Sequence, residues 1–129
     1  MEKITKDIGI LILRLSAGGL MLVHGLPKLM KFFADGPIQF ADPLGVGVTF
    51  SLILAIFSEV VCAIFILLGL KTKLASIPLA ITMFVAAFMV HANDPWKVKE
   101  KAVFYMLVYI ALFFTGSGKY SVDNSLGKS

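Results

Sequence analysis

Six ionisable side chains interrupt the apolar stretches of this sequence, and these groups are the candidates for its chemistry. They are Arg14, His24, Lys28, Glu59, His91 and Glu100. A lone charge at the centre of a membrane-spanning helix costs about 3 kcal/mol on insertion scales. Such groups therefore pair with one another, or they mark a ligand site or a path for protons. The histidines and the lysine could donate hydrogen bonds to a ligand, and either glutamate could carry protons.

One face of the first apolar segment carries both of its longest charged side chains. At 100° per residue, Arg14, Met21 and Lys28 fall within about 40° of one another on a helix. Glycines and alanines lie beside this stripe, where a second helix can approach closely. The opposite face is apolar, as Leu20 and Val23 illustrate. The pattern predicts that the charged face points into a helix bundle and away from lipid.

Glu59 is the acidic residue of the second apolar segment. A carboxylate inside a membrane must be paired or protonated. Arg14 is the predicted partner, because the two residues differ in depth by about 7–8 Å at 1.5 Å per residue. We therefore predict an Arg14–Glu59 ion pair in the interior, towards the cytoplasm. The other four groups are expected near the opposite mouth of the bundle: His24, Lys28, His91 and Glu100.

A structural interpretation of the same groups stays open. The ion pair could serve helix packing alone, and Lys28 could extend to the lipid headgroups. His24 could be a buried packing residue. His91 and Glu100 could be solvated at the ends of their helices.

The elements that must position these groups are membrane helices. The chain has 129 residues, of which 58% are hydrophobic and 16% are charged. A soluble domain is usually about 45–50% apolar and about 25% charged. We predict an all-α, integral membrane four-helix bundle, formed as a single domain over residues 1–129. The predicted helices span about residues 8–29, 48–70, 74–92 and 98–116.

The connection over residues 30–47 is the longest one. Asp35-Gly36-Pro37 and Asp42-Pro43 are turn signals, but the phenylalanines between them are too apolar for a solvated loop. We expect an interfacial or re-entrant element over the mouth of the bundle, on the non-cytoplasmic side; a plain amphipathic connector is the alternative. An even number of spans puts both termini on one side, and nearby lysines favour the cytoplasm.

Several classes of function have no support in the sequence. The pI of about 9.3 comes from scattered lysines, so nucleic acid is not a predicted partner. The lone cysteine, Cys62, cannot form an internal disulfide. Flavin, nicotinamide and iron–sulfur motifs are missing. His24 and His91 could be axial ligands of a haem or metal ion, but they lack a His-x-x-x-His spacing, and no metal site is predicted.

Three stretches in order resemble the DoxX family. The first is "LRLSAGGLMLVHGLPKL", the second "SEVVCAIFILLGLKTKLAS", and the third runs from "HANDPWKVKEK" to "GSGKYSVD". The resemblance covers about residues 10–123 and implies a small, multi-pass protein of the bacterial inner membrane. It also implies a link to respiratory and sulfur redox chemistry, through subunits of a thiosulfate:quinone oxidoreductase. Distant relatives resemble membrane chaperones and cargo receptors.

Two functions follow as hypotheses. In the first, the bundle binds a quinone-like molecule at its outer mouth, with hydrogen bonds from His24, Lys28 and His91, and a redox partner protein supplies the electrons. In the second, the chain is a non-catalytic accessory subunit or membrane chaperone that binds a partner protein. A homodimer within the lipid bilayer is compatible with either hypothesis, because a second copy could cover apolar surface.

Overall fold

The apolar stretches fold as helices, because a helix satisfies the backbone hydrogen bonds of its own segment in lipid. A computed structural model describes residues 2–38 and 40–127. The helical elements are α1 (Glu2–Phe33), α2 (Val48–Ile56), η1 (Phe57–Cys62), α3 (Ala63–Leu68), α4 (Thr72–Val85), η2 (Ala86–Val90), α5 (Trp96–Thr115) and α6 (Val122–Ser125). The elements η1 and η2 are π-helical. The described residues contain no strand, and the predicted all-α class is confirmed.

These elements join into four long helical segments within the described residues. α2, η1 and α3 form one continuous helix, and α4 continues into η2 in the same way. Three segments are long and apolar enough to cross a membrane: Glu2–Phe33, Val48–Leu68 and Thr72–Val90. The fourth segment, α5, has 20 residues, but lysines and Glu100 occupy its first turns. The arrangement agrees with the predicted membrane bundle.

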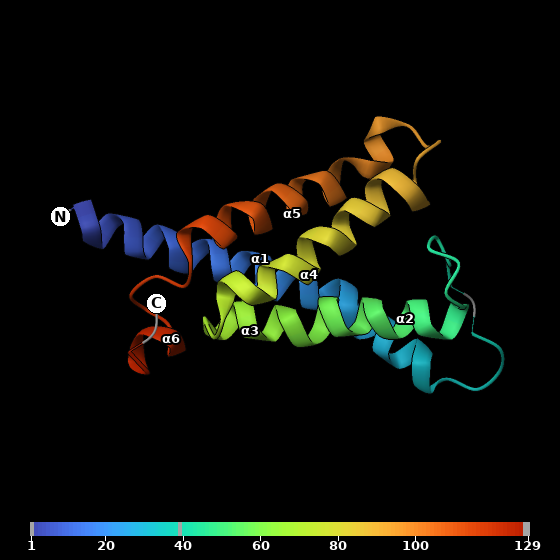
Figure 1. Ribbon diagram of the computed structural model, residues 1–129, viewed down its shortest axis with the longest axis horizontal. Coiled ribbons are helices and arrows are strands. Elements are labelled where there is room, and N and C mark those ends of the chain that lie inside the picture. Colours follow the sequence, from blue (N-terminus) through green and yellow to red (C-terminus); the bar gives the residue numbers. More distant parts are fainter. Residues whose placement is uncertain (1, 39, 128–129) are drawn as a thin grey trace.

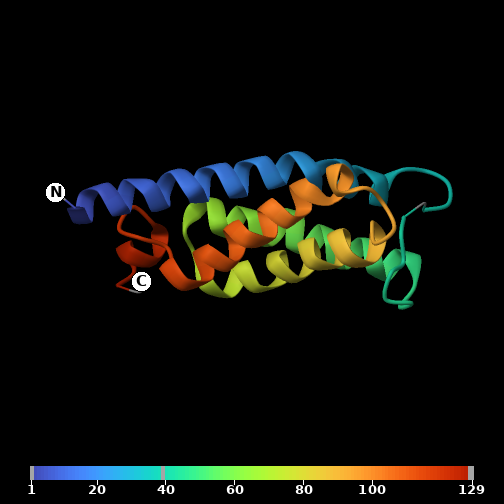
Figure 2. The ribbon, with the colours of Figure 1, turned by 90° about the horizontal axis from the view of Figure 1, so that it is seen from above.

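The segments pair in two groups that separate at one end. α1 packs on η1 and α3, and α5 packs on α4. Figure 1 shows α4 and α5 leaning away from α2 toward the end that carries the 34–47 connection. At the other end, α6 and the residues before it lie close to the end of α3. Figure 2 shows α1 extending along the whole molecule beside the other helices.

Helix α1 continues to Phe33, four residues beyond the predicted end at Leu29. Pro27 lies inside the helix without ending it, because proline fits helical φ and removes just one backbone hydrogen bond. At 1.5 Å per residue, the 32 residues of α1 extend about 48 Å, which exceeds a hydrocarbon core of about 30 Å. Lys28 is consequently more than one turn from the end of its helix.

Two glycines allow α1 to lie directly against the second helical segment. A Cβ atom at Gly25 would be 2.5 Å from the backbone oxygen of Glu59, and one at Gly18 would be 2.8 Å from that of Ala63. Such close approach of small residues is typical of helix contacts in membranes. The contact places Gly25 at the same level as Glu59.

Candidate functional site

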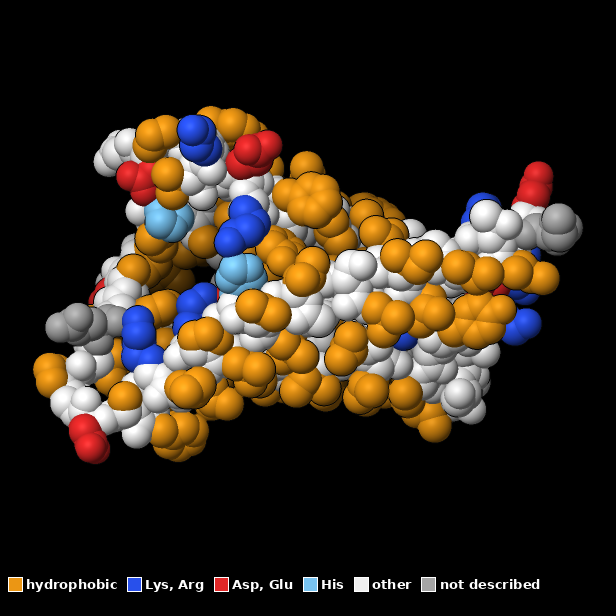
Figure 3. Space-filling model, turned by 180° about the vertical axis from the view of Figure 1, so that it is seen from behind, with side chains coloured by type: hydrophobic (Ala, Val, Ile, Leu, Met, Phe, Trp, Pro, Cys, Tyr) orange, Lys and Arg blue, Asp and Glu red, His pale blue; other side chains and the backbone are white. Residues whose placement is uncertain are grey.

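A cavity of about 510 Å³ lies where the two helix groups separate. Its walls come from α2 and η1 on one side and from α4 and η2 on the other, and most of the wall residues are apolar. Residues of the 34–47 connection also line it, and α1 contributes Lys28. Figure 3 shows a hollow at this end of the molecule, with histidine and basic side chains at its edges.

The charged groups of the cavity form an ion pair. Lys28 Nζ donates to both carboxylate oxygens of Glu59, with a distance of 2.6 Å to Oε2. Glu59 is 2% exposed, whereas the Lys28 side chain is 28% exposed. Glu59 is therefore the buried member of the pair, and Lys28 is the more accessible member. Its net charge is zero when both groups are ionised.

The predicted Arg14–Glu59 ion pair is wrong, because Glu59 pairs with Lys28 instead. Gly25 is level with Glu59, and Arg14 lies eleven residues earlier in α1, which is about 16 Å along the helix. Helical side chains also tilt toward the N-terminus. This tilt brings Lys28 back toward the level of Gly25 and directs Arg14 farther away.

Arg14 instead donates hydrogen bonds to backbone carbonyls at the end of the bundle opposite the cavity. Its Nε donates to the Ile66 carbonyl (3.1 Å), and its Nη1 donates to the carbonyls of Ser117 and Tyr120 (2.8 Å each). Nη2 donates to Leu67 at 3.3 Å. Two of these carbonyls belong to the last turn of α3, where a cation complements the helix dipole. Arg14 is thus a structural clamp between α3 and the segment before α6.

The hydroxyl groups of Ser58 and Thr82 form a second polar site on the cavity wall. Thr82 Oγ1 lies 2.8 Å from Ser58 Oγ and 2.7 Å from the Pro78 carbonyl. Ser58 and Thr82 both line the cavity. They lie outside the six predicted site residues. The signal that could have found them is Pro78 with a threonine one turn later, since such a hydroxyl can bond to the carbonyl four residues before it.

Both π-helical turns border the cavity. η1 carries Ser58 and Glu59, and η2 carries Ala86 and Val90. A π-helical turn inside an α-helix is rare and is frequently found at functional sites. Here η1 carries Glu59, whose carboxylate lies beside Lys28.

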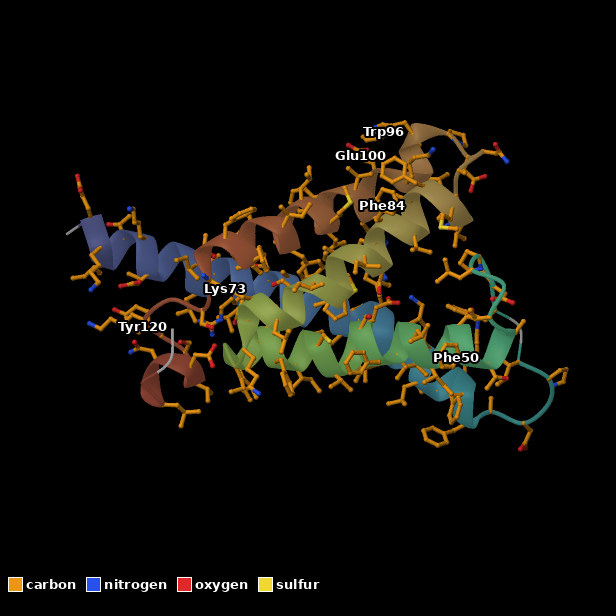
Figure 4. All side chains as sticks on the ribbon, in the orientation of Figure 1. Phe50, Lys73, Phe84, Trp96, Glu100 and Tyr120 are labelled. Carbon is orange, nitrogen blue, oxygen red and sulfur yellow. The ribbon has the colours of Figure 1, made fainter. Side chains whose placement is uncertain are left out.

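The remaining predicted site residues are divided among different surroundings. His91 lines the cavity, and its Nδ1 lies 2.7 Å from Asp94 Oδ2. His24 makes an edge-to-face contact with Tyr105, with 5.9 Å between ring centroids. Glu100 is exposed and lies near Trp96 on the outer side of α5, as Figure 4 shows. Of the six residues, the structure brings together Lys28, Glu59 and His91 at the cavity.

The 34–47 connection lies along the end of the cavity. Phe40, Ala41, Pro43 and Leu44 line the cavity, and the described residues of the connection contain no helix. Asp42 holds this turn: its Oδ1 accepts from Ser51 Oγ (2.8 Å) and the Val46 amide (3.0 Å), and its Oδ2 accepts from Gly47 (2.9 Å). The Ser51 hydroxyl, followed by these backbone amides, lowers the pKa of Asp42 below its ordinary value.

The described residues contain no group of three or more His, Cys, Asp or Glu side chains placed to hold a metal ion. Cys62 is buried among core residues that include Tyr105 and Tyr109. The groups that the cavity offers to a ligand are the polar side chains of Lys28, Ser58 and Thr82 and the apolar side chains around them.

Comparison with known proteins agrees with the membrane fold. A Mycobacterium tuberculosis protein named as an uncharacterized membrane protein is 31% identical, and the match covers 92% of this chain and 82% of that protein. A Bacillus subtilis protein named "Putative oxidoreductase CatD" is 28% identical, over 91% of this chain and 86% of its own length. No solved structure matches the chain. The sequence model of the DoxX family matches residues 9–92, and the chain therefore belongs to the DoxX family.

Proposed function

We propose that this chain binds a lipid-soluble, quinone-like molecule in the cavity beside Lys28 and Glu59. The observation that carries the proposal is an ion pair at the wall of an otherwise apolar cavity of about 510 Å³. Ligand pockets generally have volumes of about 300–1,000 Å³, apolar walls and a few placed polar groups. The name of the Bacillus subtilis relative is compatible with a redox setting.

The polar groups suit the carbonyl oxygens of a quinone. An ammonium group has three donors, and Lys28 uses its contacts to Glu59 for two of them. The third can donate to a carbonyl oxygen in the cavity. The Ser58 hydroxyl, which accepts from Thr82 and keeps its own proton, supplies a second donor position. The sequence analysis assigned a hydrogen bond to the quinone to His24. His24 packs against Tyr105 instead, and we assign this hydrogen bond to the hydroxyl position.

In this proposal, the side chains of this chain bind the quinone, and a partner carries out the electron transfer. Conversion of a quinone to a quinol takes two electrons and two protons. A redox partner protein supplies the electrons in this proposal. Lys28 donates to both carboxylate oxygens of Glu59, so its ammonium can pass one proton to a bound oxygen. Water supplies the proton that restores Lys28 and the second proton of the quinol.

Calorimetric titration of the purified, detergent-solubilised protein tests the proposal. The probe is a benzoquinone that bears one isoprenoid unit. We expect saturable binding by the wild type, and at least a tenfold loss of affinity in Ala86→Trp, which fills the cavity. The double variant Lys28→Met/Glu59→Leu should lose affinity similarly, because it removes the ammonium donor without stranding a charge.

Ile53→Trp is the matched control, because Ile53 is an exposed residue of α2 that does not line the cavity. Its affinity should equal that of the wild type. Failure of the wild type to bind the quinone would contradict the proposal, as would equal affinities in all four proteins. Capture of one stoichiometric protein partner by a wild type that binds no quinone would favour the accessory-subunit hypothesis.

A further inference from the structure

The cavity is open sideways, through the surface between two helical segments. Leu54 and Phe57 on one segment and Ile77 and Ile81 on the other line the cavity. The same four side chains are 39–57% exposed. Side chains that line a cavity and stay this exposed lie along an open side of it. We name these four residues the lateral opening.

The lateral opening lies at the depth of the hydrocarbon. Phe57 is the tenth residue of the 21-residue span Val48–Leu68, and Ile81 is the tenth residue of the 19-residue span Thr72–Val90. Both are therefore near the middle of their spans. An opening at this depth faces lipid tails and not water.

A turn partly covers the end of the bundle, where the lining residues Ala41 and Leu44 are themselves exposed. The turn from Phe40 to Leu44 lies along the cavity at that end, and Asp42 fixes the turn through Ser51 and two backbone amides. The lateral opening, at the depth of the lipid tails, favours access from the bilayer. A molecule dissolved in lipid can use this route directly.

The charges of the wall restrict the kind of head group. Lys28 and Glu59 neutralise each other, and His91 has Asp94 beside it. An anionic phospholipid head would find no unpaired cation among the described residues that line the cavity, and burial of an unbalanced charge is costly. A neutral head that accepts hydrogen bonds meets no such cost.

From these observations we infer that the ligand is a neutral amphiphile with a long apolar tail, which enters and leaves through the lateral opening. Its oxygen-bearing head lies at Lys28, and its tail passes between Phe57 and Ile81 into the bilayer. This inference rests on the proposed function of the cavity and specifies the class of ligand and its orientation.

Photolabelling tests the orientation of the tail. The probe is a long-tailed isoprenoid quinone with a diazirine at the tail end, added to the full chain in vesicles of phosphatidylcholine. We expect crosslinks on the lipid-facing residues of α2, η1 and α4. Crosslinks confined to residues 40–44 would overturn the inference, because the tail would then leave by the end of the bundle.

A pair of variants tests the route. Ile81→Trp narrows the lateral opening, and Ile53→Trp is the control at a similarly exposed position outside the cavity. Ile81→Trp should weaken binding of the long-tailed quinone at least tenfold, whereas a tail-less benzoquinone should bind within twofold of the control. Long-tailed binding within twofold of the control would overturn the inference. Failure of the tail-less quinone to bind the wild type would instead overturn the proposed function.

Discussion

Lys28 and Glu59 stabilise each other at the cavity wall, and their energetic coupling can be measured. Removal of one partner leaves the other charge without compensation in an apolar setting, which typically costs about 3–5 kcal/mol. We therefore predict that Lys28→Met and Glu59→Gln each lower the melting temperature in detergent more than the double variant does. Thermal melts of the three variants and the wild type supply the comparison.

Arg14 provides the control for this double-mutant cycle. It shares no hydrogen-bond partner with Glu59, and effects at independent sites add to within about 0.5 kcal/mol. The effects of Arg14→Leu and Glu59→Gln should accordingly be additive. Strong coupling between Arg14 and Glu59, with none between Lys28 and Glu59, would refute the pairing described here.

At the residue scale, the sequence predicts which side chains are buried better than it predicts their partners. Helical periodicity places Arg14 and Met21 on the inner face of α1 and Leu20 on the outer face, and the structure confirms all three. Which residues form pairs depends on the axial position of α1 relative to the segment Val48–Leu68. That register is set by the contact of Gly25 with Glu59, which periodicity within one helix cannot supply.

At the scale of elements, the contact of α1 with η1 sets the position of Glu59. A Cβ atom at Gly25 would lie 2.5 Å from the Glu59 backbone oxygen, and the helix backbone cannot yield as a flexible side chain would. Gly25→Ala should therefore cost about 1–3 kcal/mol and separate Glu59 from Lys28. Chemical denaturation of the detergent-solubilised protein measures the loss.

Gly9 supplies a matched control within the same helix. A Cβ atom there has no neighbour within 4 Å, and alanine is the better helix former by up to about 1 kcal/mol. Gly9→Ala should leave stability unchanged or raise it. If both variants are equally stable, the close contact at Gly25 does not determine the position of η1.

The turn over the cavity should be sensitive to acid. Hydrogen bonds from Ser51 and backbone amides lower the pKa of Asp42 in the folded chain, so its stabilising contribution is present above the ordinary aspartate pKa of about 3.9. That contribution is lost as the pH falls through the lowered value. Exchange rates of the Val46 and Gly47 amides, corrected for intrinsic pH dependence, should rise below about pH 4.

Asp42→Ala removes the acceptor for these amides, so its exchange should be fast at every pH. Ser51→Ala removes one donor and should shift the wild-type transition toward higher pH, because the Asp42 pKa then moves back toward its ordinary value. Exchange that is identical in the wild type and Asp42→Ala would contradict the role assigned to Asp42.

The elements were partly predictable from the sequence. Apolar length indicated the helices, and three of them are long and apolar enough to cross a membrane. The continuation of α1 past Pro27 was not predictable, because proline signals a helix end in water while neighbouring helices tolerate it in a membrane. The π-helical turns were missed as well, since their widening depends on tertiary contacts more than on residue type.

At the scale of the whole molecule, the two ends of the bundle differ. Arg14 holds one end closed through four backbone carbonyls. At the other end α4 and α5 lean away from α2 (Figure 1), and the cavity lies between the helix groups. This asymmetry places a neutral polar pair within reach of lipid. We therefore attribute binding to the open end and structural support to the closed end.

The central claim is that the cavity holds the head of a quinone-like ligand against Lys28. An experimental structure of the wild type with a bromine-labelled short-chain benzoquinone tests it most directly. The account predicts that bromine density lies within the cavity, and that a quinone oxygen lies within hydrogen-bonding distance of Lys28 Nζ. Bromine density elsewhere on the protein, with an empty cavity at saturating quinone, would contradict it.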